Sequence, residues 1–92
     1  IGMLEMEDEG GTDEKLIVVP GDRISRLYSE VQTVRELPSL IRDQITHFFQ
    51  HYKDLEPGKW VSIKGWHGPQ DAKKAIVDSV ERFRTDPSKP HF

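Results

Sequence analysis

Six carboxylates lie within the eleven residues EMEDEGGTDEK, which run from Glu5 to Lys15. Neighbouring carboxylates repel and raise one another's pKa, so a cluster of them needs either solvent or a bound cation. Hard divalent ions such as Mg²⁺ prefer carboxylate oxygens, although the spacing from Asp8 does not match an EF-hand loop. Lys15 directly follows the acids and is placed to neutralise one of them or to contact a phosphate. The residues alone leave two interpretations open, a solvated hairpin tip and a magnesium site.

A second group of polar residues repeats at helical spacing further along the chain. His47, His51 and Asp54 fall on one side of a predicted helix, nearly opposite its apolar face. Histidines at i and i+4 can bind zinc, but HFFQH lacks the glutamate of an HExxH site, and no third ligand is evident. On residue types alone, a protein interface and plain solvent exposure explain this stripe equally well.

The acidic run must be positioned by the elements on either side of it. The run MLEM at 3–6 predicts a short strand before the acids. The β-branched run LIVV at 16–19 predicts a second strand, which ends at Pro20 because proline cannot continue the hydrogen-bond ladder. The intervening sequence DEGGTDE then indicates an expanded hairpin loop, in which the two glycines supply backbone freedom.

Helical periodicity is strongest between residues 37 and 55, where apolar residues recur at helical spacing and a Pro-Gly pair ends the pattern. Residues 59–66 alternate as a strand does, which would put both tryptophans on one side of it. Pro69 opens a second predicted helix with one apolar face. A short helical turn is expected near residues 25–28. These elements predict one small α+β domain.

Composition excludes several classes of protein. The chain has 92 residues and a net charge of -3, with no basic surplus that would indicate nucleic-acid binding. No apolar run approaches the roughly 20 residues of a membrane span, so no membrane partner is expected. The absence of cysteine excludes disulfides and thiolate metal sites and is compatible with the cytosol. Ile1 is not an initiator Met, and we expect that sequence upstream of it has been removed.

Three segments together resemble a known family. MEDEGGTDEKL at 6–16, ITHFFQHYKDL at 45–55 and GKWVxIxGW at 58–66 resemble the C-terminal half of a soluble, bacterial-type (family I) inorganic pyrophosphatase. The likeness runs from Ile1 to about Arg84, and the three motifs follow the family's order and spacing. The resemblance implies Mg²⁺-dependent hydrolysis of pyrophosphate to two phosphates by a cytoplasmic enzyme.

The same resemblance implies roles for individual positions around the acidic turn. Asp8 and Asp13 match acids that bind Mg²⁺, and Glu9 matches an acid that lines the same cavity. Lys15 matches a lysine that balances the acids. These four residues are therefore the expected catalytic group.

Two further groups are implied by the helix segment. Tyr52 and Lys53 match a Tyr-Lys pair that holds a phosphate of the substrate. His47, His51 and Asp54 match residues that join the two trimers of hexameric bacterial members, so the resemblance favours an interface for the polar stripe. It thus implies a homo-oligomer, with a hexamer expected for the parent enzyme.

The implied fold is α+β, part of an OB-like closed β-barrel with two helices packed outside. Residues 1–85 would be the C-terminal portion of one pyrophosphatase domain, and 86–92 a loose tail. The family's Asp-x-Asp-Pro-x-Asp motif and most of its pyrophosphate-gripping residues lie upstream of the matching stretch, so this chain alone is predicted to be inactive. The alternative is a non-catalytic oligomerisation or interaction module.

Overall fold

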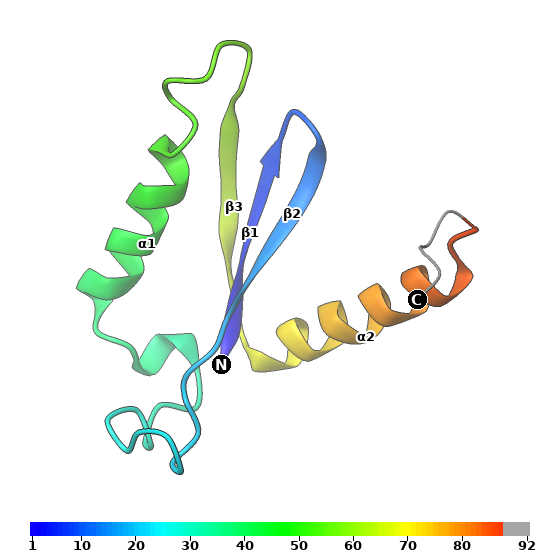
Figure 1. The fold of residues 1–92 in the computed structure, drawn as a ribbon. Coiled ribbons are helices and arrows are strands. Elements are labelled where there is room, and N and C mark those ends of the chain that lie inside the picture. Colours follow the sequence, from blue (N-terminus) through cyan, green and yellow to red (C-terminus); the bar gives the residue numbers. More distant parts are fainter. Residues whose placement is uncertain (88–92) are drawn as a thin grey trace.

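The computed structural model describes residues 1–87, which form a three-stranded antiparallel sheet with two α-helices (Figure 1). The elements are β1 (Gly2–Asp8), β2 (Gly11–Ile17), a 3₁₀-helix η1 (Val34–Glu36), α1 (Ser39–His51), β3 (Val61–His67) and α2 (Pro69–Thr85). The strand order β2-β1-β3 makes β1 the central strand. The predicted α+β class is confirmed, and the sheet is open, with β2 and β3 at its edges.

The hairpin between β1 and β2 is tighter than expected. Asp8 pairs with Gly11, so only Glu9 and Gly10 form the loop, and the prediction of an expanded loop was wrong. Gly11 has φ +113°, a conformation that favours glycine, and the backbone N–H of Gly10 donates to the Asp8 carboxylate. These two features close the turn early, and Asp13 therefore lies within a strand.

A β-bulge interrupts the pairing of β1 with β3. Glu5 pairs with Gly65 and Met6 with Ile63, which leaves Lys64 as the extra residue. Gly65 has φ +148°, a backbone conformation that glycine adopts without strain. The strict alternation expected over residues 59–66 therefore fails at the bulge.

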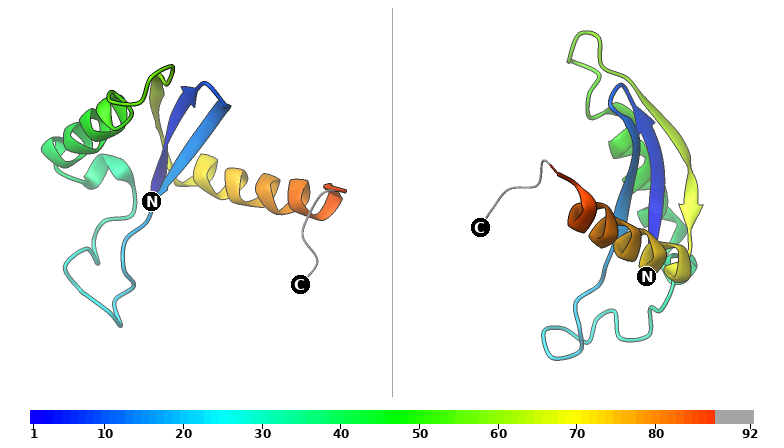
Figure 2. Two further views of the ribbon diagram at one scale, coloured as in Figure 1. Left: turned by 45° about the horizontal axis from the view of Figure 1, so that its top comes forward. Right: turned by 90° about the vertical axis from the view of Figure 1, so that its right-hand side faces the viewer.

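The two α-helices lie on opposite faces of the sheet, as Figures 1 and 2 show together. On the face toward α1, Leu4 and Met6 are completely buried. Trp66 lies opposite Leu4 in the register, and its indole N–H donates to the Thr46 hydroxyl of α1 over 3.1 Å. Met3 of β1 alternates to the other face, and it too is buried.

The core is small, and α2 extends well beyond it. The buried apolar residues of the described part are Met3, Leu4, Met6, Val34, Leu37 and Ala72. Of these only Ala72 belongs to α2, while Ile76, Val80 and Phe83 of that helix remain 44–48% exposed. The described residues therefore cover only part of the apolar face of α2.

The helix boundaries differ from expectation at two places. α1 ends at His51 rather than near residue 55, because the chain then turns with hydrogen bonds such as Asp54 N–H to His51 carbonyl. Near residues 25–28 the backbone forms hydrogen-bonded turns instead of the expected helical turn. α2 starts at Pro69 as predicted. Within the tail expected at 86–92, residues 88–92 lie outside the described part.

Candidate active site

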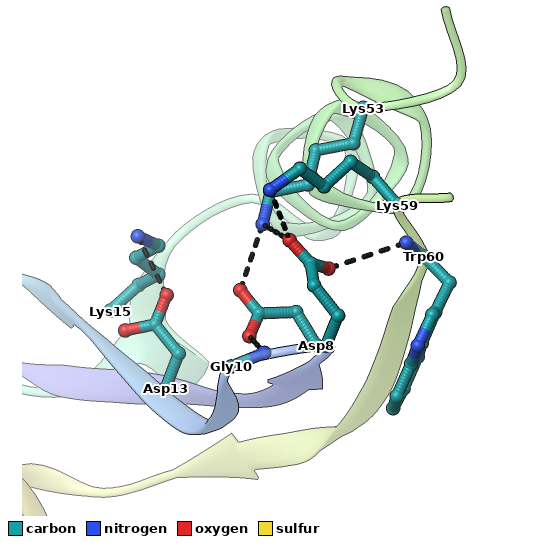
Figure 3. A network of polar contacts seen from close by, with 8 residues as sticks. Asp8, Gly10, Asp13, Lys15, Lys53, Lys59 and Trp60 are labelled. Atoms are coloured by element: carbon teal, nitrogen blue, oxygen red, sulfur yellow. Dashed lines mark hydrogen bonds and ion pairs between the residues drawn. The ribbon is translucent and has the colours of Figure 1, made fainter. Parts of the chain in front are cut away.

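An ion-pair cluster joins the hairpin tip to the segment that follows α1. Lys53 Nζ lies 2.9 Å from Asp8 Oδ2 and 3.1 Å from Glu9 Oε1 (Figure 3). The side chains of Lys53 and Asp8 are only 17% and 16% exposed. Two acids from the hairpin and a lysine more than forty residues later along the chain therefore meet in a partly buried site.

The local fold explains why these side chains converge. Asp8 is the last residue of β1, on the sheet face toward α1, and the Gly10 N–H donates to its Oδ1 over 2.8 Å. Tyr52 caps α1 by donating its N–H to the Phe48 carbonyl, and Lys53 comes directly after it. The end of the helix thus carries Lys53 to the hairpin tip.

Glu9 has further partners that sequence reasoning missed. Lys59 Nζ lies 3.2 Å from Glu9 Oε1, and the backbone N–H of Trp60 donates to Oε2 over 3.4 Å. Gly58, at φ +77°, reverses the chain just before them. The only sequence signal was that Pro-Gly turn, which indicates a reversal but not its partner. Glu9 therefore connects the hairpin tip to both ends of the turn that follows α1.

Asp13 and Lys15 form a second ion pair on β2. Lys15 Nζ lies 2.8 Å from Asp13 Oδ2 and 5.5 Å from the centroid of the Phe49 ring of α1. The hydrogen bond that Lys15 donates to the Asp13 carboxylate raises the pKa of Lys15. Asp13 pairs with Met6 and Asp8 with Gly11, so both aspartates are on the sheet face toward α1.

The ion pairs keep all the charged groups of the cluster ionised. The hydrogen bond from Lys53, with that from the Gly10 N–H, lowers the pKa of Asp8. Hydrogen bonds from its own backbone N–H, then from the two lysines, lower the pKa of Glu9 to about 2. Asp8 and then Glu9 raise the pKa of Lys53. At neutral pH the site presents two carboxylates held by ammonium groups.

Tyr52 lies at the same end of α1 as Lys53. Its ring stacks on Phe48 at 5.7 Å and meets Phe49 edge-on at 5.5 Å, and Lys53 Nζ lies 5.5 Å from its centroid. The aromatic cluster thus fixes the ring beside the lysine. The structure brings Lys53 beside Asp8, Glu9 and the Tyr52 ring, while Asp13 pairs separately with Lys15; the roles of these residues stay predictions.

The polar stripe, which consists of His47 and His51 of α1 and Asp54 just after that helix, forms a separate exposed group. The rings of His47 and His51 lie 4.6 Å apart, and His51 Nδ1 lies 2.8 Å from Asp54 Oδ2. All three side chains are exposed. None of these contacts involves the hairpin-tip acids.

The donor chemistry around Asp8 fits a hard divalent cation. Carboxylate oxygens are the ligands that Mg²⁺ prefers, and this ion commonly uses one or two of them while keeping several waters. Asp8 and Asp13 supply such oxygens on one face of the hairpin. Within residues 1–87, no three acidic, histidine or cysteine side chains converge as a metal-binding group. No helix in this part of the chain has the length and hydropathy to cross a bilayer.

Comparison with known proteins identifies relatives of high identity. The family model described as inorganic pyrophosphatase matches residues 1–84. Inorganic pyrophosphatases from Mesorhizobium japonicum and Aquifex pyrophilus are 55% and 52% identical to the chain over 84 residues. Both alignments cover 91% of this chain and 48% of the relative. The chain therefore spans about half the length of the curated relatives it matches.

Solved structures agree. An inorganic pyrophosphatase from Helicobacter pylori matches with a TM-score of 0.88 and 43% identity, over 91% of this chain and 49% of that one. One from Coxiella burnetii matches with a TM-score of 0.84 and 44% identity, over 88% and 48%. The resemblance found in the sequence motifs is confirmed, and the chain belongs to the inorganic pyrophosphatase family of enzymes.

Proposed function

We propose that this chain contributes part of the active site of a Mg²⁺-dependent inorganic pyrophosphatase, which hydrolyses pyrophosphate to two phosphates. The observation that carries the proposal is the convergence of Asp8, Glu9 and Lys53 at the hairpin tip. Acids for a cation and a lysine for an anion within one partly buried site are what phosphoryl transfer to water requires. The family to which the chain belongs supports the same reaction.

Asp8 and Asp13 are the proposed Mg²⁺ ligands, because both offer carboxylate oxygens on the same face of the hairpin. Bound divalent ions lower the pKa of a water nucleophile and neutralise charge on the phosphates. Glu9 lines the same site and is held in place by Lys53 and Lys59. Lys15 balances the charge of Asp13.

Tyr52 and Lys53 are the proposed phosphate-binding pair. The Lys53 ammonium is a compact positive charge with three donors, which suits a phosphate oxygen. Tyr52 is fixed beside it by Phe48 and Phe49, so its hydroxyl can be presented without a large loss of side-chain freedom. The pair would orient one phosphate while the acids hold the cation.

The proposed site is completed by residues outside this chain. The chain spans about half the length of the relatives that it matches, and we expect the other half to supply the rest of the site. Residues that act as a unit lose activity together, so we expect negligible activity from these 92 residues alone. The proposed activity is therefore that of the whole protein, of which this chain is one part.

The polar stripe on α1 is the proposed contact between copies in a homo-oligomer, a hexamer for the whole enzyme. His47, His51 and Asp54 are exposed and already arranged as one group, with His51 paired to Asp54. Protein interfaces often have about the same composition as the rest of the surface, so polar residues such as these can form one. The cytoplasmic location expected from the sequence stays a prediction.

Fusion to a relative tests the proposal directly. The chain would replace the matching half of the Mesorhizobium japonicum enzyme, with the other half placed upstream, and phosphate release from pyrophosphate would be followed in excess Mg²⁺. We expect activity that Asp8→Asn lowers at least about tenfold, since metal-site substitutions cost this much. Glu14→Gln, an exposed acid on the opposite face of β2, is the control. A folded but inactive fusion would favour the alternative, a non-catalytic oligomerisation or interaction module.

A further inference from the structure

Lys53 holds the oxygen that a cation at Asp8 would need. Both oxygens of the Asp8 carboxylate are engaged, Oδ1 by the Gly10 N–H at 2.8 Å and Oδ2 by Lys53 Nζ at 2.9 Å. The bond from Gly10 is part of the hairpin turn itself, so breaking it would disturb the backbone. The lysine is the partner that can leave, because its four-carbon stem is flexible.

A cation and the ammonium of Lys53 repel one another at Oδ2 of Asp8. Like charges a few ångströms apart repel, and the repulsion is stronger in a partly buried site than in bulk water. Lys53 and Asp8 are 17% and 16% exposed, so solvent screens the pair only in part. Binding of one positive charge at this oxygen therefore opposes binding of the other.

We propose that Lys53 and a divalent cation compete for Oδ2 of Asp8, so that binding of the cation releases the lysine toward the substrate's phosphate. The inference rests on the proposed function, and it adds an order to the binding steps. The cation is bound first, and the ammonium it displaces becomes free to pair with an anion. Lys53 thus links the binding of the two ligands.

The contacts of Glu9 make this exchange selective. When Lys53 leaves, Glu9 keeps Lys59 at 3.2 Å and the Trp60 N–H at 3.4 Å. Asp8 keeps only the Gly10 N–H and is the carboxylate whose charge is uncovered. The cation therefore gains a ligand at Asp8 while Glu9 still anchors the turn after α1 to the hairpin tip.

Mn²⁺ binding to the 92-residue chain tests the competition without any assay of activity. Free Mn²⁺ would be measured by electron paramagnetic resonance for the chain and for Lys53→Met, which removes the charge but keeps the length. We expect Lys53→Met to bind Mn²⁺ about three- to tenfold more tightly, the effect of losing one competing ion pair. Lys64→Met is the matched control, because Lys64 pairs with Glu7 instead of the hairpin-tip acids. Unchanged or weaker binding by a folded Lys53→Met chain would overturn the competition.

Asp8→Asn separates this inference from the proposed function. If Asp8→Asn weakens Mn²⁺ binding and Lys53→Met does not tighten it, the cation site stands and only the competition is overturned. If Asp8→Asn binds as tightly as the unmodified sequence does, in the 92-residue chain or, where that chain binds no Mn²⁺, in the fusion with the other half, the cation site at Asp8 is wrong and both proposals fall.

A second measurement on the unmodified chain removes any dependence on how the variants fold. The side-chain NMR signals of Lys53 would be followed during titration with Mg²⁺. Competition predicts that these signals shift as Mg²⁺ binds. Lysine signals that stay in place at saturating Mg²⁺ would overturn the proposal.

Discussion

The indole N–H of Trp66 on β3 donates to the hydroxyl of Thr46 on α1 across 3.1 Å. This bond crosses from the sheet to the helix whose end carries Lys53, so it helps to set where that lysine reaches the hairpin. Trp66 and Thr46 are both half-buried, and an indole N–H left without a partner there would be costly. The bond is structural, and it supports the site from about two helical turns before Lys53.

Thr46→Val tests that support. The substitution keeps the shape of the side chain but removes the acceptor, so we expect the free energy of unfolding to fall by about 1–3 kcal/mol. Thr12→Val, at an exposed position of β2, is the matched control and should change it by less than about 0.5 kcal/mol. Urea denaturation followed by tryptophan fluorescence measures both, and equal effects would show that the bond adds nothing.

Gly2 has no room for a side chain. A Cβ atom there would lie 2.5 Å from the His67 carbonyl oxygen and 2.5 Å from a methyl carbon of Val34. Gly2→Ala should therefore lower the free energy of unfolding by about 1–3 kcal/mol, the usual cost of overpacking. At Gly21 no atom lies within 4 Å of the same position, so Gly21→Ala should stay within about 0.5 kcal/mol. A thermal melt of each variant decides, and a neutral Gly2→Ala would contradict the packing described.

Low pH should lower the stability of the fold, because it protonates Glu9 and breaks its ion pairs. Its pKa is about 2 in the folded chain against an ordinary value of 4.5, so its ion pairs stabilise the fold above pH 4.5. This contribution is lost as pH falls from 4.5 toward 2, and Asp8, whose pKa is also lowered, acts in the same direction. Urea midpoints between these pH values should fall less steeply for Glu9→Gln than for the unmodified chain. Identical slopes for the two would contradict the ion pairing of Glu9.

The polar stripe should control assembly of the whole enzyme. In the fusion with the Mesorhizobium japonicum half, His51→Glu would place a second carboxylate beside Asp54, whose oxygen lies 2.8 Å from the histidine. We expect hexamers to dissociate into smaller species, because like charges at an interface oppose association. Gln70→Glu makes the same change in charge at an exposed site of α2 and should leave assembly intact. Analytical ultracentrifugation distinguishes the outcomes, and unchanged hexamers in His51→Glu would place the interface elsewhere.

The sequence predicted the order of the elements well, and it failed where geometry depends on one residue. The β-branched and alternating runs predicted three strands, and three formed, but the second was placed at 16–19 and runs over Gly11–Ile17, so only Leu16 and Ile17 agree. Paired glycines fit several loop lengths, so the two-residue turn at Glu9 and Gly10 could not be chosen in advance. The bulge at Lys64 also has no periodic signal, because it is set by pairing with β1.

The candidate site, too, could be predicted from the sequence only in part. Its residue types were evident from sequence, and the resemblance grouped Asp8 with Lys53 although they are far apart along the chain. The contacts of Lys59 and of the Trp60 backbone with Glu9 could not be predicted, because they depend on where the turn after α1 passes the hairpin. Tertiary structure decided them.

The central claim is that this chain carries one part of a pyrophosphatase site that a second part completes. Its most direct test is phosphate release from pyrophosphate in excess Mg²⁺, by the 92-residue chain alone and after mixing with the separately produced other half of the Mesorhizobium japonicum enzyme. The account predicts no release from either part alone and release from the mixture, lost again with Asp8→Asn. A mixture that forms a stable complex and releases no phosphate would contradict it.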